Sequence, residues 1–120
     1  MATPITTLKK RADFLRLNRG HKYIAPSFIL RYLPTAGEGA CRVGYTVTTK
    51  CGNAVIRNRI KRRLRALMRE LAAACIPGTD YVLIARAGAE VSAADVTPAD
   101  LRAQLEKALT SAAARLRPRP

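Results

Sequence analysis

The densest group of chemically active side chains in this sequence is a run of cations between Arg57 and Arg65. Six of these nine residues are basic, and no acid occurs between Lys50 and Glu70. Arginine predominates in the run, and its planar guanidinium group donates two parallel hydrogen bonds to phosphate oxygens. Like charges one helical turn apart repel each other, so this spacing indicates that a bound polyanion supplies the missing negative charge.

The charge of the whole chain favours the same interpretation. In 120 residues, 22 Lys+Arg stand against 8 Asp+Glu, which gives a formal net charge of +14. Residues 1–70 contain sixteen of the basic and three of the acidic side chains, whereas residues 71–120 are nearly balanced. Such an excess is relieved by a polyanion, and nucleic acid is the first candidate, ahead of an anionic membrane surface.

Two other interpretations of the basic run stay open. One is a solvated basic face, although such a face normally alternates cations with acids. The other is a helix on a membrane surface, although the apolar stripe here lacks Trp and Phe and is needed for the core. No apolar run approaches the roughly 20 residues of a membrane span, and Met1 to Lys10 lacks the apolar core of a secretory signal. We therefore expect a cytoplasmic protein without a membrane partner.

The sequence shows no constellation for catalysis or metal binding. The acids are scattered, and the only histidine, His21, has no evident partner. The three cysteines, Cys41, Cys51 and Cys75, form no C-x-x-C pair and are interpreted as small apolar side chains in a reducing compartment. We therefore assign no catalytic residue, no metal ligand and no small-molecule substrate to this chain.

Periodicity predicts a short helix at the N-terminus and two strands after it. Thr7 is expected to cap a helix over about residues 8–18, with Phe14 and Leu17 beside an apolar stripe of Leu8, Ala12 and Leu15. In the segment SFILRYL, one strand face is apolar (Phe28, Leu30 and Tyr32), and the other (Ile29, Arg31 and Leu33) faces solvent or a ligand. A strand over residues 41–48 has a small, polar face of Gly44, Thr46 and Thr48. Together these faces predict a shallow floor on which a ligand could lie.

The basic run lies on the next predicted helix. Asn53 is expected to cap a helix over about residues 54–75, which Pro77 and Gly78 end. The apolar run YVLIAR then predicts a central buried strand, reached by a crossover to a parallel neighbour. A last helix opens at Pro98. We expect one domain over residues 1–114 and a mobile basic Arg/Pro tail over residues 115–120.

The segment GNAVIRNRIKRRLR, preceded by RVGYTVTTK, closely resembles the RNR-motif segment of bacterial ribonuclease P protein subunits. The resemblance extends over most of the chain, including the Asp13-Phe14 pair, FILRYL and YVLIAR. It implies a single-domain α+β fold, an α-β-β-β-α-β-α sandwich similar to domain 2 of ribosomal protein S5. It also implies a left-handed crossover at the RNR helix, against the usual rule. Lys22 to Ile24 is the candidate for the additional strand.

The resemblance also implies a function. The chain would be the non-catalytic protein subunit of a ribonucleoprotein endoribonuclease, whose RNA subunit removes the 5′ leader from precursor tRNA with bound Mg²⁺. Its partners would be the ribonuclease P RNA and precursor tRNA. The residues carried over to the RNA-binding surface are Lys50, Arg57, Asn58, Arg59, Lys61, Arg62, Arg65 and Arg69. Those carried over to a cleft for the single-stranded leader, which Lys50 borders, are Phe14, Arg31, Thr46 and Thr48.

The sequence departs from the family pattern within this cleft. Asn18 stands one turn after Phe14, where a second aromatic is frequent, and Arg31 also replaces a frequent aromatic. We therefore expect the cleft to depend more on charge and less on stacking. An ordinary core role for Phe14 and ordinary strand roles for Thr46 and Thr48 stay open. So do two competing functions, a structural ribosomal or chromosomal binding protein and a free-standing nuclease.

Overall fold

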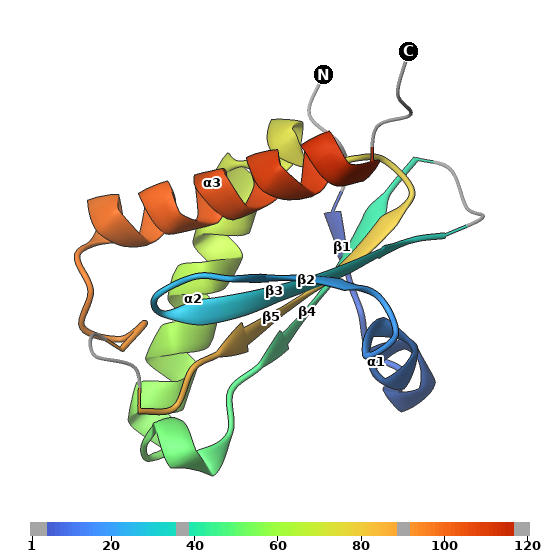
Figure 1. The fold of residues 1–120 in the computed structure, drawn as a ribbon. Helices are drawn as coiled ribbons and strands as arrows, with labels where there is room; N and C mark the ends of the chain where they lie inside the picture. The colour runs from blue at the N-terminus through green and yellow to red at the C-terminus, as the bar shows by residue number, and fades with distance from the viewer. Residues whose placement is uncertain (1–4, 36–38, 89–91, 117–120) are drawn as a thin grey trace.

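The computed structural model describes residues 5–35, 39–88 and 92–116, which form one five-stranded sheet with helices on both faces (Figure 1). The order from α1 onward is the expected α-β-β-β-α-β-α, so the α+β fold class is confirmed. The elements are β1 (Ile5–Thr7), α1 (Arg11–Leu17), β2 (His21–Ile24), β3 (Phe28–Pro34), β4 (Cys41–Thr46), η1 (Thr49–Cys51), α2 (Ala54–Glu70), η2 (Ala72–Ala74), β5 (Thr79–Ala85) and α3 (Pro98–Leu116).

The sheet has the strand order β1-β4-β5-β3-β2. Strands β1, β4 and β5 run parallel, whereas β3 pairs antiparallel with β5 and with β2. The apolar strand β5 lies at the centre, as its continuous hydrophobic run predicts. Helix α2 connects β4 to its parallel neighbour β5, so the predicted crossover is confirmed. The left-handed sense of that crossover stays a prediction.

The main core lies between the sheet and the two long helices, α2 and α3, which cover the same face of the sheet (Figure 1). Each element contributes one apolar stripe, because the periods of strand and helix place those residues on one side. The fully buried side chains there include Phe28, Leu30 and Tyr32 from β3, Ile60, Leu64 and Met68 from α2, and Leu101, Leu105 and Leu109 from α3. The predicted inward face of β3 is therefore confirmed, and the apolar stripes of α2 and α3 meet it in one core.

The N-terminal segment differs from its prediction. Residues 5–7 form the short strand β1, which pairs parallel with β4, and the Leu8 N–H donates to the Val43 carbonyl over 2.9 Å. Thr7 therefore belongs to a strand and caps no helix. Helix α1 begins only at Arg11, after Lys10, whose side chain makes no capping bond.

The later start of α1 also changes which side chains face the sheet. Leu8 lies outside the helix, so the predicted stripe has no helical basis. Leu15 is 54% exposed, whereas Leu17 is fully buried in a small cluster with Leu8 and Val82, against which Phe14 packs. Helix α1 therefore covers the sheet face opposite α2 and α3, with Phe14 and Leu17 as its contacts.

The ends of the other two helices are also corrected. Helix α2 ends at Glu70, and a separate short 3-10 helix, η2, replaces the last turn of the predicted helix. Helix α3 includes Arg115 and Leu116, which the prediction placed in the tail, while residues 117–120 lie outside the described part. Within the described residues, no helix is long and apolar enough to cross a bilayer.

Candidate nucleic-acid interface

Helix α2 presents part of the predicted basic run, Lys61, Arg62 and Arg65 with Asn58, along one side, whereas Arg59 and Arg63 project from the other side of the apolar stripe. The helix begins after Asn53, whose side-chain oxygen accepts the Ile56 N–H over 3.0 Å and so satisfies one free donor of the first turn. Its apolar stripe is buried against the core. The outward side has a shallow concavity of about 520 Å³, lined by Val55, Asn58, Lys61, Arg62 and Arg65. Val55 is 75% exposed there, so an apolar surface lies among the cations.

Two arginines of α2 have structural partners. Arg63 donates from Nη1 to the carbonyls of Ala93 and Ala94, over 2.9 and 2.6 Å, and from Nη2 to the carbonyl of Val96. This side chain therefore holds the segment before α3 against α2. Arg57, a member of that set, is half-buried and donates from Nε to the Gly52 carbonyl over 3.2 Å.

The other predicted cations of α2 have no acidic partner in the described parts of the chain. The nearest acid in sequence, Glu70, pairs with Arg102 of α3. Asp13 and Asp80 pair with Arg16 and Arg42 on the opposite side of the sheet. The uncompensated side chains on α2 are Arg59, Lys61, Arg62, Arg65 and Arg69. These like charges repel one another, and no acid among the described residues offsets them. This is the arrangement that the sequence predicts for a face that binds a polyanion.

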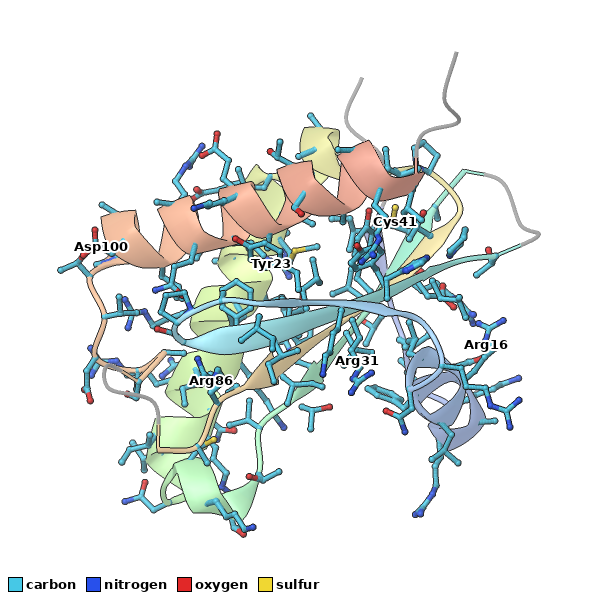
Figure 2. All side chains as sticks on the ribbon, viewed as in Figure 1. Arg16, Tyr23, Arg31, Cys41, Arg86 and Asp100 are labelled. Carbon is cyan, nitrogen blue, oxygen red and sulfur yellow. The ribbon has the colours of Figure 1, made fainter. Side chains whose placement is uncertain are left out.

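A second concavity of about 240 Å³ lies between α1 and the open face of the sheet. Phe14, Arg31 and Thr46 line it together, so three of the four predicted cleft residues are brought to one place. Arg31 extends from β3 on the side of α1, and its Nη1 donates to the Asn18 carbonyl over 3.3 Å (Figure 2). Thr48 does not line this cleft. It lies beyond the end of β4 and is exposed, as is Lys50 in η1.

The cleft also contains residues that the sequence analysis did not select. Its lining includes Arg11, Val82 and Ile84, beside Asn18, which the family comparison had already placed there. Beneath Phe14 lies Gly44 of β4, where an added Cβ would be 2.5 Å from Cζ and 2.6 Å from Cε1 of the ring. The Phe14 ring therefore rests directly on the backbone of β4, and any side chain at position 44 would displace it. The predicted small face of β4 was the only sequence signal for this contact.

Substitution of Gly44 by alanine is expected to lower the free energy of unfolding by about 1–3 kcal/mol, because the added methyl group overlaps the Phe14 ring. Denaturant unfolding of the two proteins measures this difference. In a Phe14→Ala background the same substitution should lower the free energy of unfolding much less, because the ring that the methyl group would overlap is absent. Equal costs in both backgrounds would show that the ring does not occupy the space above Gly44.

A network of ion pairs fastens α1 to the sheet beside the cleft. The Asp80 carboxylate, only 2% exposed, accepts from Arg42 Nε over 2.9 Å, from Arg42 Nη2 over 2.6 Å and from Arg16 Nη2 over 2.6 Å. Arg42 Nη1 also donates to Asp13 on α1 over 3.2 Å. The hydrogen bonds to Asp80 raise the pKa of Arg42 above its usual value. One buried carboxylate on β5 thus joins α1, β4 and β5.

The remaining reactive side chains form no further centre among the described residues. No group of three His, Cys, Asp or Glu side chains there could hold a metal ion. The three cysteines form no disulfide. Cys41 and Cys75 are buried and Cys51 packs against the core, so their predicted role as small apolar side chains is confirmed.

The fold and these two surfaces are typical of an α+β nucleic-acid-binding domain. Comparison with known proteins makes the assignment specific, because a family model described as Ribonuclease P matches residues 4–113. The chain belongs to the ribonuclease P protein family, whose members are components of a ribonucleoprotein nuclease of tRNA processing.

Individual relatives agree in sequence and in structure. The ribonuclease P protein component of Erythrobacter litoralis is 49% identical over 82 residues, which cover 68% of this chain and 67% of that protein. The one from Gluconacetobacter diazotrophicus is 42% identical over 110 residues, covering 90% and 95%. The solved RNase P protein of Staphylococcus aureus has a TM-score of 0.75 at 33% identity, covering 88% and 94%. That of Thermotoga maritima has a TM-score of 0.76 at 25% identity, covering 88% and 96%.

Proposed function

We propose that this chain is the non-catalytic protein subunit of ribonuclease P and that it binds RNA through two separate surfaces. The basic face of α2 binds the RNA subunit, and the cleft beneath α1 holds the single-stranded 5′ leader of precursor tRNA. Binding both partners assists the endonucleolytic removal of the leader, which produces the mature 5′ end of the tRNA.

The observation that supports this proposal most strongly is the separation of the two surfaces on one small fold. The α2 face offers several exposed guanidinium groups without acidic partners, which suits the phosphates of a folded RNA. The cleft combines an aromatic ring, one arginine and a polar strand, which suits a single strand whose bases are free to stack. A protein that binds only duplex or folded RNA has no need of the second surface.

The chemistry of the reaction is assigned in this proposal to the RNA subunit. The family resemblance implies that Mg²⁺ ions bound mainly by the RNA activate the cleavage. The described residues of this chain provide no cluster of acids that would hold such an ion alone. The part of the protein is to bind, orient and neutralise the phosphates of the two RNAs.

Substitution of Phe14 by alanine is expected to weaken the binding of precursor tRNA to the assembled holoenzyme by about 1–3 kcal/mol, because one base loses its stacking partner. The affinity for mature tRNA, which has no leader, should not change. Equilibrium binding with both RNAs measures the two values.

The matched control is Ile24→Ala, because Ile24 is a similarly large apolar residue, is exposed on β2 and does not line the cleft. It should bind both tRNAs like the unsubstituted protein. Equal losses for precursor and mature tRNA in Phe14→Ala would assign Phe14 to the protein core and remove it from the leader-binding surface.

A further inference from the structure

Two arginines at the end of the α2 basic face lie beside a second, smaller pocket. Arg65 and Arg69 are one turn apart, are exposed, and have no hydrogen bond or ion pair with any described residue. The pocket lies between α2 and the edge of the sheet, and has a volume of about 90 Å³. We call it the edge pocket, and its lining is Ile5, Thr6, Thr7, Val43, Tyr45, Arg65 and Arg69.

Tyr45, which carries a hydroxyl group, lines the edge pocket together with these two cations. The Arg65 guanidinium carbon lies 5.6 Å from the centroid of the Tyr45 ring, so the two side chains form a cation–π interaction. Burial raises the pKa of Tyr45 to about 12, although the charges of Arg65 and Arg69 act in the opposite direction. The phenol is therefore protonated at neutral pH. Its hydroxyl has no hydrogen bond to a described residue.

Strand β1 supplies the opposite wall of the pocket. Within the described residues it is an edge strand that pairs with β4 alone, so some of its backbone N–H groups have no partner strand there. The Thr7 side chain is exposed on the same face of the sheet as Val43 and Tyr45, whereas Thr6, paired with Arg42, directs its side chain to the opposite face. Among the described residues, the lining thus combines two guanidinium groups, a phenol and the Thr7 alcohol, with no carboxylate. Its volume of about 90 Å³ is several times the roughly 10–15 Å³ that one water molecule needs, which leaves room for a phosphate group.

We propose that the edge pocket binds one backbone phosphate of RNA, with Arg65 and Arg69 on its oxygens and the Tyr45 hydroxyl as a further donor. This inference rests on the proposed function and extends it, because it continues the path of the RNA from α2 across to β1. The pocket lies on the side of the sheet that α2 covers, away from the leader cleft beneath α1. We therefore assign the phosphate to the RNA subunit, and the alternative source is precursor tRNA.

The test compares Tyr45→Phe, Arg69→Gln and the control Lys107→Gln with the unsubstituted chain. Tyr45→Phe keeps the ring beneath Arg65 and removes only the hydroxyl, whereas Lys107→Gln removes one charge from the exposed surface of α3. Affinity for the isolated ribonuclease P RNA is measured over a range of salt concentrations. Affinity of each holoenzyme for precursor tRNA is measured separately, and thermal unfolding confirms that each variant folds.

The proposal predicts that Arg69→Gln weakens binding to the RNA subunit about tenfold and that Tyr45→Phe weakens it about fivefold. The slope of log K against log salt should become less steep by about 0.7–0.9 for Arg69→Gln, because one phosphate contact is lost. Lys107→Gln should have little effect on either quantity. The double variant should lose less than the two single losses together predict, because both side chains bind the same phosphate.

Unchanged affinity in Tyr45→Phe, with Arg69→Gln no weaker than Lys107→Gln, would overturn the edge pocket while leaving the proposed function intact. Losses seen only with precursor tRNA would support the phosphate site and move its source to the substrate. Failure of the unsubstituted chain to bind the RNA subunit would overturn both the proposed function and this inference.

Discussion

Substitution of Arg62 by alanine is expected to weaken the binding of the ribonuclease P RNA by about 1–3 kcal/mol, the range for a charge-assisted contact to phosphate. Arg62 is exposed, lines the concavity on α2, and has no acidic partner among the described residues. Its removal therefore leaves the fold intact and acts on the partner alone. Titration of the RNA with each protein at one fixed salt concentration measures the difference.

Arg57→Ala provides an informative comparison with Arg62→Ala. Because Arg57 also bonds to the Gly52 carbonyl, its loss should reduce both the RNA affinity and the stability of the first turn of α2. Lys107→Ala on α3 is the charge-matched control and should leave RNA affinity nearly unchanged. If Arg62→Ala and Arg57→Ala both bind the RNA as tightly as the unsubstituted protein, the α2 face is not the site of RNA binding.

Substitution of Arg42 by methionine is expected to lower the free energy of unfolding by about 3 kcal/mol. The substitution leaves the buried Asp80 carboxylate with only one of its two arginine partners, and an undercompensated buried charge is costly. Methionine retains the length and apolar stem of the side chain, so packing changes little. Chemical denaturation at neutral pH measures the loss.

The loss in free energy of unfolding caused by Arg42→Met should be smaller when Asp80 is also replaced by asparagine. The double variant then has no buried carboxylate that lacks a partner. Arg102→Met removes an arginine from the exposed pair with Glu70 and should cost no more than about 1 kcal/mol. A loss in Arg42→Met as small as that in Arg102→Met would contradict the assignment of Asp80 as the residue that joins α1 to the sheet.

The elements that the sequence predicted well are those with long apolar patterns. The stripes of α2 and α3 repeat over several turns, and β5 is a continuous hydrophobic run, so local periodicity determines their type and their buried side. Strand β1 was missed because it has only three residues, and its pairing partner β4 lies far along the chain. Its parallel pairing with β4 also explains why α1 starts later than expected.

The candidate site was predictable to a similar degree. The basic face of α2 followed from residue type and helical spacing, since both are local properties. The cleft was predicted in part, because strand alternation placed Arg31 and Thr46 on the open face, whereas Thr48 lies past the end of β4. The contact of Phe14 with Gly44 depends on how closely α1 approaches the sheet, which no local pattern encodes.

The ion pairs around Asp80 were missed for the same reason. Asp13, Arg42 and Asp80 lie on three different elements and are far apart in sequence. In the sequence alone, nothing indicates that Asp13 and Asp80 lie close to each other or to Arg42. Only the packing of α1 against β4 and β5 shows that they neutralise part of the basic charge and leave the α2 face uncompensated.

Reconstitution of 5′ leader cleavage tests the central claim most directly. The purified chain would be mixed with a bacterial ribonuclease P RNA and precursor tRNA at low magnesium, with protein-alone and RNA-alone reactions as controls. We expect cleavage at the mature 5′ end only when the protein and the RNA subunit are both present. Cleavage by the protein alone, or no stimulation of a matched RNA by the folded chain, would contradict the proposed function.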